Sequence, residues 1–213
     1  MTPLAGALAL AGLVLGLVAD RVATRWPEHD EEHPPGRRID WRTVVCGLFG
    51  AFALATVGNR FAGDALALVL FGAWAATLVI GLATDLDQRL LPNELTIPTI
   101  PIAAVYALSG VNPLVAGDLL PTIAVAVAIP ALLFVASIPF GEGAFGVGDV
   151  KLLAGVGLMT GSLRAFTGVV SGLFAAGIVL VILLATRRVT LKTYVPYGPF
   201  LIFGAIWGLV VRP

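Results

Sequence analysis

Residues 163–186 read LRAFTGVVSGLFAAGIVLVILLAT, and Arg164 is the one charged side chain in this run. A helix of about 20 apolar residues crosses a hydrocarbon core of roughly 30 Å, so the run predicts a membrane span. Residues 64–83, DALALVLFGAWAATLVIGLA, predict a second span in the same way. Shorter or less uniform apolar runs bring the expected number of spans to about eight, within a range of six to eight: Leu4–Val22, Thr43–Val57, Glu94–Leu108, Leu114–Ile138, Val150–Thr160 and Pro196–Val211.

The composition also indicates an integral membrane protein. Of 213 residues, 58% are hydrophobic and 12% are charged, and the mean hydropathy is +0.97. Soluble domains carry about 25% charged residues, and these figures also exclude a disordered chain. The formal net charge is zero, which argues against a nucleic-acid partner, and the single cysteine, Cys46, excludes an internal disulfide. We expect an all-α, polytopic membrane helical bundle that forms one domain over residues 1–213.

The distribution of basic residues predicts the orientation of the spans. The odd-numbered connections hold ten arginine and lysine residues, whereas the even-numbered connections and the C-terminal tail hold three. The positive-inside rule therefore places the odd connections in the cytoplasm. Among them is the polar segment 25–42, which is too short to bury a core and is expected to be a cytoplasmic loop. Arg187, Arg188 and Lys192 are expected to contact anionic membrane lipid on the same face.

Several ionisable residues near the spans have simple structural explanations. Asp64 and Asp118 open apolar runs, so we expect them to act as helix N-caps or as favourable charges at helix N-termini. Asp87 and Arg89 follow the run that ends at residue 83, and we expect them to stay solvated rather than to contact a ligand.

Pairs of glycines four residues apart indicate close helix packing. Gly12 and Gly16 form one pair, and Gly168 and Gly172 form another. We expect both pairs to pack inside the bundle rather than at a dimer interface, and the sequence leaves the oligomeric state open.

The first of two polar segments that suggest a chemical role follows the apolar run 64–83. Residues 84–93 read TDLDQRLLPN, in which Asp85 directly follows an apolar run and Pro92 and Asn93 begin the next element. An ionisable side chain in or beside a span costs free energy and often marks function. The alternative is that Asp85 is a helix-end carboxylate paired with Arg89.

The second polar segment precedes the span 150–160. Residues 141–151 read GEGAFGVGDVK, with Asp149 after Gly146 and Gly148. Glycine permits backbone torsions that other residues resist, and it allows another chain to approach closely. The alternative is that Asp149 only caps the following helix, with Lys151 neutralising it.

Under the expected span count, both segments reach the cytoplasmic face. Two carboxylates that meet in a site of low dielectric constant share one proton, as in aspartic proteases. Asp85 and Asp149 are therefore candidates for such a catalytic pair.

These segments resemble the motifs of the type IV prepilin leader peptidases, which are membrane aspartic peptidases of the GxGD type. The first family motif, an Asp followed seven residues later by Pro, matches Asp85 and Leu91-Pro92-Asn93. The second motif, GxGDxK, matches residues 146–151. A third match is residues 196–201, PYGPFL, which is similar to a conserved stretch of the bacterial family.

The resemblance implies a membrane endopeptidase. It would cleave the short basic leader from a prepilin or pseudopilin at the cytoplasmic face of a prokaryotic inner membrane, for type IV pilus assembly or protein secretion. Asp85 and Asp149 would activate water without a cofactor or metal. Motif support would come from Gly146, Gly148, Lys151, Pro92 and Asn93.

One departure from the family pattern concerns the loop 25–42. Many bacterial members carry two CxxC pairs there, which bind zinc, and they also methylate the new N-terminus. This loop has no cysteine, which counts against methylation but not against peptidase activity. His29 and His33 could in principle ligate a metal, although we expect them to solvate a flexible acidic loop.

Three other readings remain open at this point. A small transporter could use Asp85 and Asp149 as a proton relay, although no inverted repeat is evident. A presenilin-like protease would carry a Pro-Ala-Leu motif where this chain has Pro196-Tyr197-Gly198. An inactive peptidase homologue would have little reason to retain both aspartates.

Overall fold

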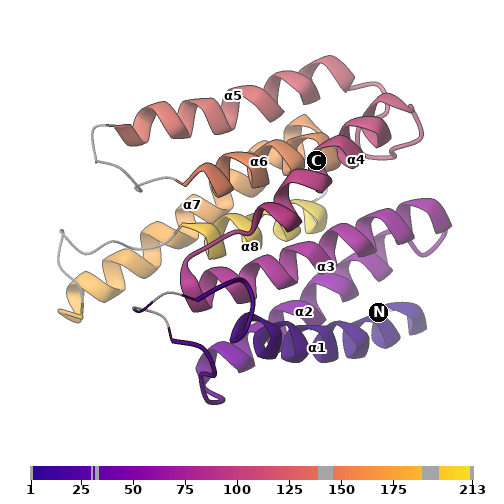
Figure 1. The fold of residues 1–213 in the computed structure, drawn as a ribbon. Helices are drawn as coiled ribbons and strands as arrows, with labels where there is room; N and C mark the ends of the chain where they lie inside the picture. The colour runs from indigo at the N-terminus through magenta and orange to yellow at the C-terminus, as the bar shows by residue number, and fades with distance from the viewer. Residues whose placement is uncertain (1, 30, 32–33, 139–145, 189–196, 212–213) are drawn as a thin grey trace. The chain divides into compact units, whose positions relative to one another are not determined.

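The computed structural model describes residues 2–29, 31, 34–138, 146–188 and 197–211. Across these residues the chain forms eight α-helices and no strand (Figure 1). Their bounds are α1 Pro3–Ala23, α2 Trp41–Arg60, α3 Ala65–Gln88, α4 Asn93–Leu108, α5 Leu119–Ser137, α6 Val147–Thr160, α7 Ser162–Ala185 and α8 Gly198–Val210. Each helix overlaps one of the eight apolar runs, although α5 starts at Leu119 rather than at Leu114, and the prediction of an all-α membrane bundle is confirmed.

The helices differ in their capacity to cross a membrane. Among the described residues, α1, α2, α3, α5 and α7 are long and apolar enough to do so, and α8 is apolar but shorter. Helices α4 and α6 have 16 and 14 residues, below the length of a typical span. Five long helices together with α8 correspond to the lower end of the predicted range of six to eight spans.

The chain divides into two compact units, Met1–Thr99 and Ile100–Pro213, and the division falls within α4. The prediction of one peptidase domain stays a prediction.

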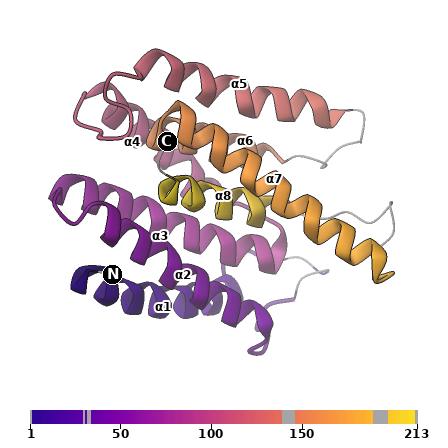
Figure 2. The same cartoon turned by 180° about the vertical axis from the view of Figure 1, so that it is seen from behind.

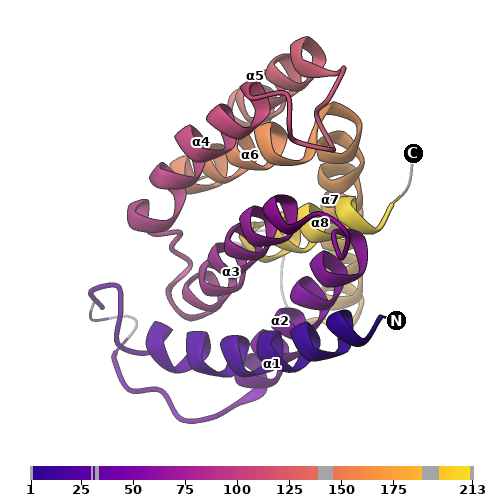
Figure 3. The same ribbon diagram turned by 90° about the vertical axis from the view of Figure 1, so that its right-hand side faces the viewer.

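In the first unit, α1 packs closely along α2, and both contact α3 (Figure 3). Gly12 and Gly16 face α2 so closely that a Cβ at either position would lie 2.0 Å from a backbone oxygen, that of Gly50 or Cys46. The expected internal packing of this glycine pair is confirmed. Phe71 of α3 stacks on Phe61 with ring centroids 4.3 Å apart.

In the second unit, α7 packs along α8, and α5 contacts both α6 and α7 (Figure 2). A Cβ at Gly168 or Gly172 would lie 2.5 Å from the carbonyl oxygen of Gly204 or Phe200 in α8. The second glycine pair therefore also packs inside the chain, as expected.

The two expected N-cap aspartates behave differently. Asp64 caps α3, because its carboxylate accepts the Ala67 backbone N–H at 2.9 Å. Asp118 is the N-cap residue of α5, but its side chain makes no capping hydrogen bond to that helix. Its carboxylate instead accepts hydrogen bonds from the backbone N–H and the hydroxyl of Ser162, so it joins the starts of α5 and α7. Asp118 therefore occupies the N-cap position of α5 as expected, but its side chain serves the N-terminus of α7 instead of its own helix.

Candidate active site

Asp85 lies in the last turn of α3 and is 5% exposed. The helix ends because Arg89 adopts a left-handed conformation, with φ 56°, and donates its backbone N–H to the Asp85 carbonyl at 2.9 Å. A positive φ at a non-glycine residue is uncommon, so this is a sharply defined helix end. Helix α3 thus extends past the apolar run 64–83 and carries Asp85 to its end.

The motif proline begins the next helix. Pro92 is buried, and its carbonyl accepts the backbone N–H groups of Leu95 and Thr96, both at 3.1 Å. Proline suits a helix start because its φ is fixed near the helical value and it has no N–H to leave unpaired. Asn93 is the first residue of α4 and is exposed. A single short turn therefore joins Asp85 to the Pro92-Asn93 pair.

Asp149 lies in the first turn of α6, directly after the Gly-rich segment. Its carboxylate accepts the Gly146 backbone N–H at 3.2 Å, which ties the aspartate to the residue that precedes the helix. Gly148 belongs to the same first turn. The Asp149 side chain therefore makes the local capping contact that the alternative reading predicts.

The structure corrects one expectation about the GxGD glycines. Gly146 has φ −74° and ψ 150°, an extended conformation that any residue can adopt. A Cβ added there would meet the Asp149 carboxylate at 3.4 Å, an ordinary van der Waals contact. Backbone freedom is therefore not the reason for glycine at position 146.

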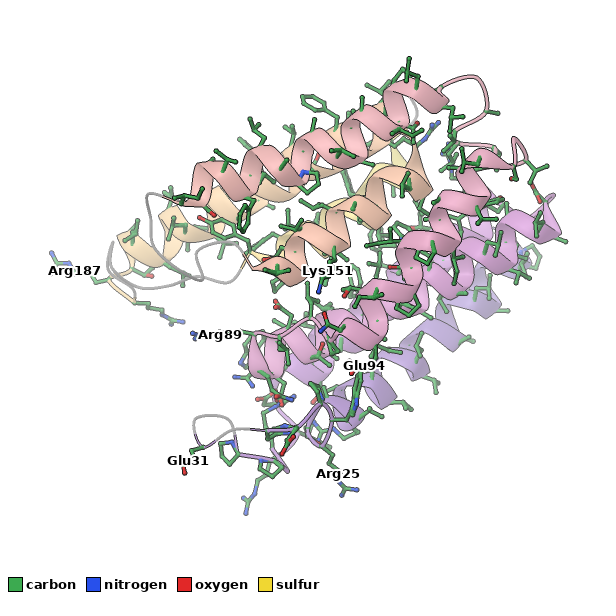
Figure 4. The ribbon with its side chains drawn as sticks, turned by 45° about the horizontal axis from the view of Figure 1, so that its top comes forward. Arg25, Glu31, Arg89, Glu94, Lys151 and Arg187 are labelled. Atoms are coloured by element: carbon green, nitrogen blue, oxygen red, sulfur yellow. The ribbon has the colours of Figure 1, made fainter. Side chains whose placement is uncertain are left out.

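Lys151 lies on α6, two residues after Asp149, and is half-buried (Figure 4). Residues 141–145 of the same motif region lie outside the described residues, as does Pro196 of the third motif. The described part of that motif begins at Tyr197, and α8 starts at Gly198.

Each aspartate is thus held at a helix end next to its motif partners. Asp85 belongs to the first compact unit and Asp149 to the second, so the pairing of their carboxylates stays a prediction.

Asp87 has surroundings that the sequence did not reveal. It is 7% exposed, and its carboxylate contacts Arg37 Nε at 2.7 Å, His29 Nε2 at 3.2 Å and Arg42 Nη1 at 3.4 Å. The expectation that Asp87 stays solvated is wrong, because the loop 25–42 folds back over the end of α3 and supplies it with cationic partners.

Arg37 is the centre of this arrangement. Besides Asp87, its guanidinium contacts the carboxylates of Asp20 in α1 and Asp40 at the start of α2. Burial lowers the pKa of Arg37, but the hydrogen bonds and charges of Asp87 and Asp20 raise it by more, so the pKa lies above its ordinary value. We call this group the Arg37 cluster; it comprises Asp20, Arg21, His29, Arg37, Asp40, Arg42, Thr43 and Asp87.

Asp20 was missed by the sequence analysis. It is fully buried within α1 and accepts hydrogen bonds from Arg21, from Arg37 and from the Thr43 hydroxyl, the last at 2.7 Å. A carboxylate inside an apolar run requires a partner, and this was the signal available in the sequence.

The loop is therefore partly built into the first unit. The His29 side chain is 4% exposed against Asp87, so the expectation that it solvates a flexible loop is wrong. His33 lies outside the described residues. Arg25 and Glu31, in contrast, point away from the helices (Figure 4). Within the described part of the chain, no three His, Cys, Asp or Glu side chains form a group that could hold a metal.

Comparison with known proteins identifies the family. The model of the type IV leader peptidase family matches residues 73–186, which is more than half of the chain and includes both motif aspartates. The chain belongs to this family.

Curated relatives of this peptidase family carry matching names. The type 4 prepilin-like proteins leader peptide-processing enzyme of Escherichia coli is 32% identical over 157 residues, which cover 73% of this chain and 55% of the relative. The prepilin leader peptidase/N-methyltransferase of Burkholderia pseudomallei is 30% identical over 172 residues, covering 80% of this chain and 54% of the relative. The protein of the same name from Bacillus subtilis is 30% identical over 178 residues, with coverages of 80% and 66%.

This chain spans about half the length of the first two of these peptidases. No solved structure matches it. The family match begins at residue 73, so the Arg37 cluster combines one matched residue, Asp87, with residues of α1, the following loop and the start of α2 that lie outside the match.

Proposed function

We propose that this chain is a membrane aspartic endopeptidase that removes the short basic leader from prepilin or pseudopilin proteins, with Asp85 and Asp149 as the catalytic residues. The observation that carries the proposal is the family match over residues 73–186, because it contains an aspartate at the end of α3 and another at the start of α6. Both stand in the motif contexts that the sequence analysis singled out.

In the proposed reaction, the two carboxylates share one proton. The ionised carboxylate removes a proton from water as the water oxygen attacks the scissile carbonyl carbon, and the protonated carboxyl donates its proton to the carbonyl oxygen. The resulting gem-diol collapses: the C–N bond breaks, the leaving nitrogen takes a proton from the first carboxyl, and one gem-diol hydroxyl returns its proton to the second carboxylate, which restores the starting pair. Such a step needs no covalent intermediate with the protein.

Local geometry supports these roles. The Gly146 N–H holds Asp149 through one carboxylate oxygen, and the helix end at Arg89 fixes the backbone at Asp85. Gly146 and Gly148 have no side chain that would obstruct an extended substrate segment beside Asp149. Pro92 and Asn93 lie at the start of α4, seven and eight residues after Asp85, and Lys151 lies two residues after Asp149, so in this proposal they support the aspartate of their own motif.

The charge distribution supports a cytoplasmic site on the inner membrane. Asp85 and Asp149 lie next to odd-numbered connections, which carry most of the arginine and lysine residues. A basic leader remains on this side while the apolar helix of the substrate stays in the membrane.

Methylation of the new N-terminus is a separate reaction. Two relatives are named peptidase/N-methyltransferase, but this chain covers only part of their length, and Cys46 is its one cysteine. The two CxxC pairs that the family resemblance links to the methylating members thus have no counterpart here.

The test is co-expression of a tagged prepilin with the wild type, Asp85→Asn and Asp149→Asn in membranes. We expect the wild type to remove the leader and both variants to leave it in place, because an amide can neither accept the proton of water nor share a proton. Gel shift and N-terminal mass measure processing, and the mass also reveals any added methyl group.

Glu31→Gln is the matched control, since it removes a carboxylate from an exposed position in the loop. Processing by either aspartate variant at the wild-type rate would contradict the assigned pair. Failure of the wild type on several prepilins would contradict the peptidase proposal and favour the proton-relay reading.

A further inference from the structure

The Arg37 cluster links three helices to the turn that carries Asp85. Arg37 contacts Asp20 in α1, Asp40 at the start of α2 and Asp87 in the last turn of α3. Its five donors form a rigid planar fork, which suits simultaneous contact with several carboxylates better than a lysine would. One side chain from the loop thus joins the ends of α1, α2 and α3.

The charges of the cluster balance. Asp20, Asp40 and Asp87 provide three negative charges, and Arg21, Arg37 and Arg42 provide three positive charges. Buried carboxylates are tolerated only when their partners replace the lost hydration. Removing Arg37 would take one positively charged partner from each of the buried carboxylates Asp20 and Asp87.

Further hydrogen bonds fix the loop in place. Arg21 donates to the Arg37 carbonyl at 3.2 Å and to the Thr43 hydroxyl at 3.1 Å. Asp40 accepts the Arg42 backbone N–H at 2.8 Å, which starts α2 directly beside the cluster. Residues of α1 and at the start of α2 therefore hold Arg37 in place, in addition to its contact with Asp87 of α3.

The contact with α3 lies immediately beside the proposed catalytic residue. Asp87 is two residues after Asp85, and residues at this spacing point to different sides of a helix. Gln88, the next residue, donates to the Pro27 carbonyl at 3.3 Å, so the loop holds the last turn at two consecutive positions. The cluster thus restrains the backbone of the turn while the Asp85 carboxylate faces elsewhere.

We infer that Arg37 and Asp87 are positioning residues, whose ion pair holds the last turn of α3 and thereby sets the place of the Asp85 carboxylate. This inference rests on the proposed function, since it assigns Asp85 the catalytic role. In this inference, the loop 25–42 supports catalysis through Arg37, and this role requires neither a metal nor a cysteine.

The test compares Arg37→Gln, Asp87→Asn and the double variant in purified protein, with a prepilin peptide as substrate. We expect each single variant to lower kcat by about 10–100-fold while KM changes by less than about threefold, because a small displacement of a catalytic group slows the reaction more than it weakens substrate binding. The double variant should lose little more than the worse single variant, since both changes break the same pair.

Arg38→Gln is the matched control, because Arg38 is the neighbouring arginine and its side chain is exposed. Its kcat should stay within about twofold of the wild type, whereas Arg37→Lys should recover part of the activity by keeping the charge. Wild-type kcat in both Arg37→Gln and Asp87→Asn, or multiplying losses in the double variant, would overturn the inference.

Two further measurements separate positioning from loss of folded protein. The pH profile of kcat should narrow in Arg37→Gln, because two carboxylates that approach less closely share their proton less strongly. A smaller folded fraction would lower the profile without changing its shape, and that result would overturn the positioning role.

Hydrogen exchange of residues 82–93 requires no activity and should accelerate in Arg37→Gln but not in Arg38→Gln. If the wild type processes no prepilin, the proposed function fails, whatever the exchange shows. If the wild type is active and exchange in this turn is unchanged by Arg37→Gln, the positioning inference fails alone.

Discussion

At the end of α3, Asp85 and Asp87 lie two residues apart and differ in their surroundings. Asp87 is held by Arg37, Arg42 and His29, all from the loop and the start of α2. Removing one partner of such a buried pair costs about 3–5 kcal/mol, because it leaves an uncompensated charge. The Asp87 carboxylate is therefore bound into the packing of the first unit, whereas the proposed chemistry belongs to Asp85.

Asn112 gives a prediction about stability at the residue scale. Its side chain is fully buried, donates to the Met159 carbonyl at 3.0 Å and accepts the Leu114 backbone N–H at 2.9 Å. Asn112→Ala leaves both backbone groups without these bonds, and each buried unsatisfied group costs about 1–3 kcal/mol. We expect a loss of this size in the free energy of unfolding, measured by denaturant titration in detergent micelles.

Asn59→Ala is the control for this prediction, because Asn59 is exposed near the end of α2. An equal loss of stability in Asn59→Ala and Asn112→Ala would show that the buried bonds of Asn112 contribute nothing.

At the scale of the elements, glycine decides how closely the helices approach. A Cβ at Gly12 would lie 2.0 Å from the Gly50 carbonyl oxygen, whereas one at Gly6 of the same helix would meet nothing within 4 Å. Gly12→Ala should therefore push α1 away from α2 and lower the free energy of unfolding of the first unit by about 1–3 kcal/mol, which is the usual cost of overpacking a core. Gly6→Ala should be neutral or stabilising, because alanine favours helix. Thermal unfolding in micelles measures both.

The same comparison is available in α7. A Cβ added at Gly168 would lie 2.5 Å from the Gly204 carbonyl oxygen, whereas one added at Gly177 would meet nothing within 4 Å. Gly168→Ala should lower the melting temperature and Gly177→Ala should not. Equal melting temperatures would mean that α7 and α8 can separate at no cost.

At the scale of the whole molecule, the bias of arginine and lysine predicts the topology. Glu31 and Arg188 lie in odd-numbered connections, and Ser109 lies in an even-numbered one. In a Cys46→Ser background, a cysteine placed at residue 109 should react with an impermeant maleimide in intact cells. Cysteines placed at residues 31 and 188 should react only after the membrane is opened. The opposite labelling would invert the predicted orientation and place the proposed site outside.

Much of the fold was predictable because apolar runs and helix ends are local features. All eight runs became helices, and α3 and α6 end and begin at the two motif segments. The lengths of the helices were less well predicted, since polar residues such as Arg42 and Arg60 extend α2 beyond its apolar run 43–57. Helix formation requires only backbone hydrogen bonds, which polar residues also form.

The sequence by itself therefore determined the all-helical membrane class, the family motifs and the positions of Asp85, Pro92 and Asp149 at helix ends. Only the tertiary structure decided which charges are paired. Asp20 and Asp87 are 67 residues apart in sequence and share Arg37. Such pairing depends on where the loop 25–42 packs against the helices. The sequence of an irregular loop has no periodic pattern from which these contacts could be predicted. The physical reason is that burial makes an ion pair obligatory, and burial is a property of the packed chain.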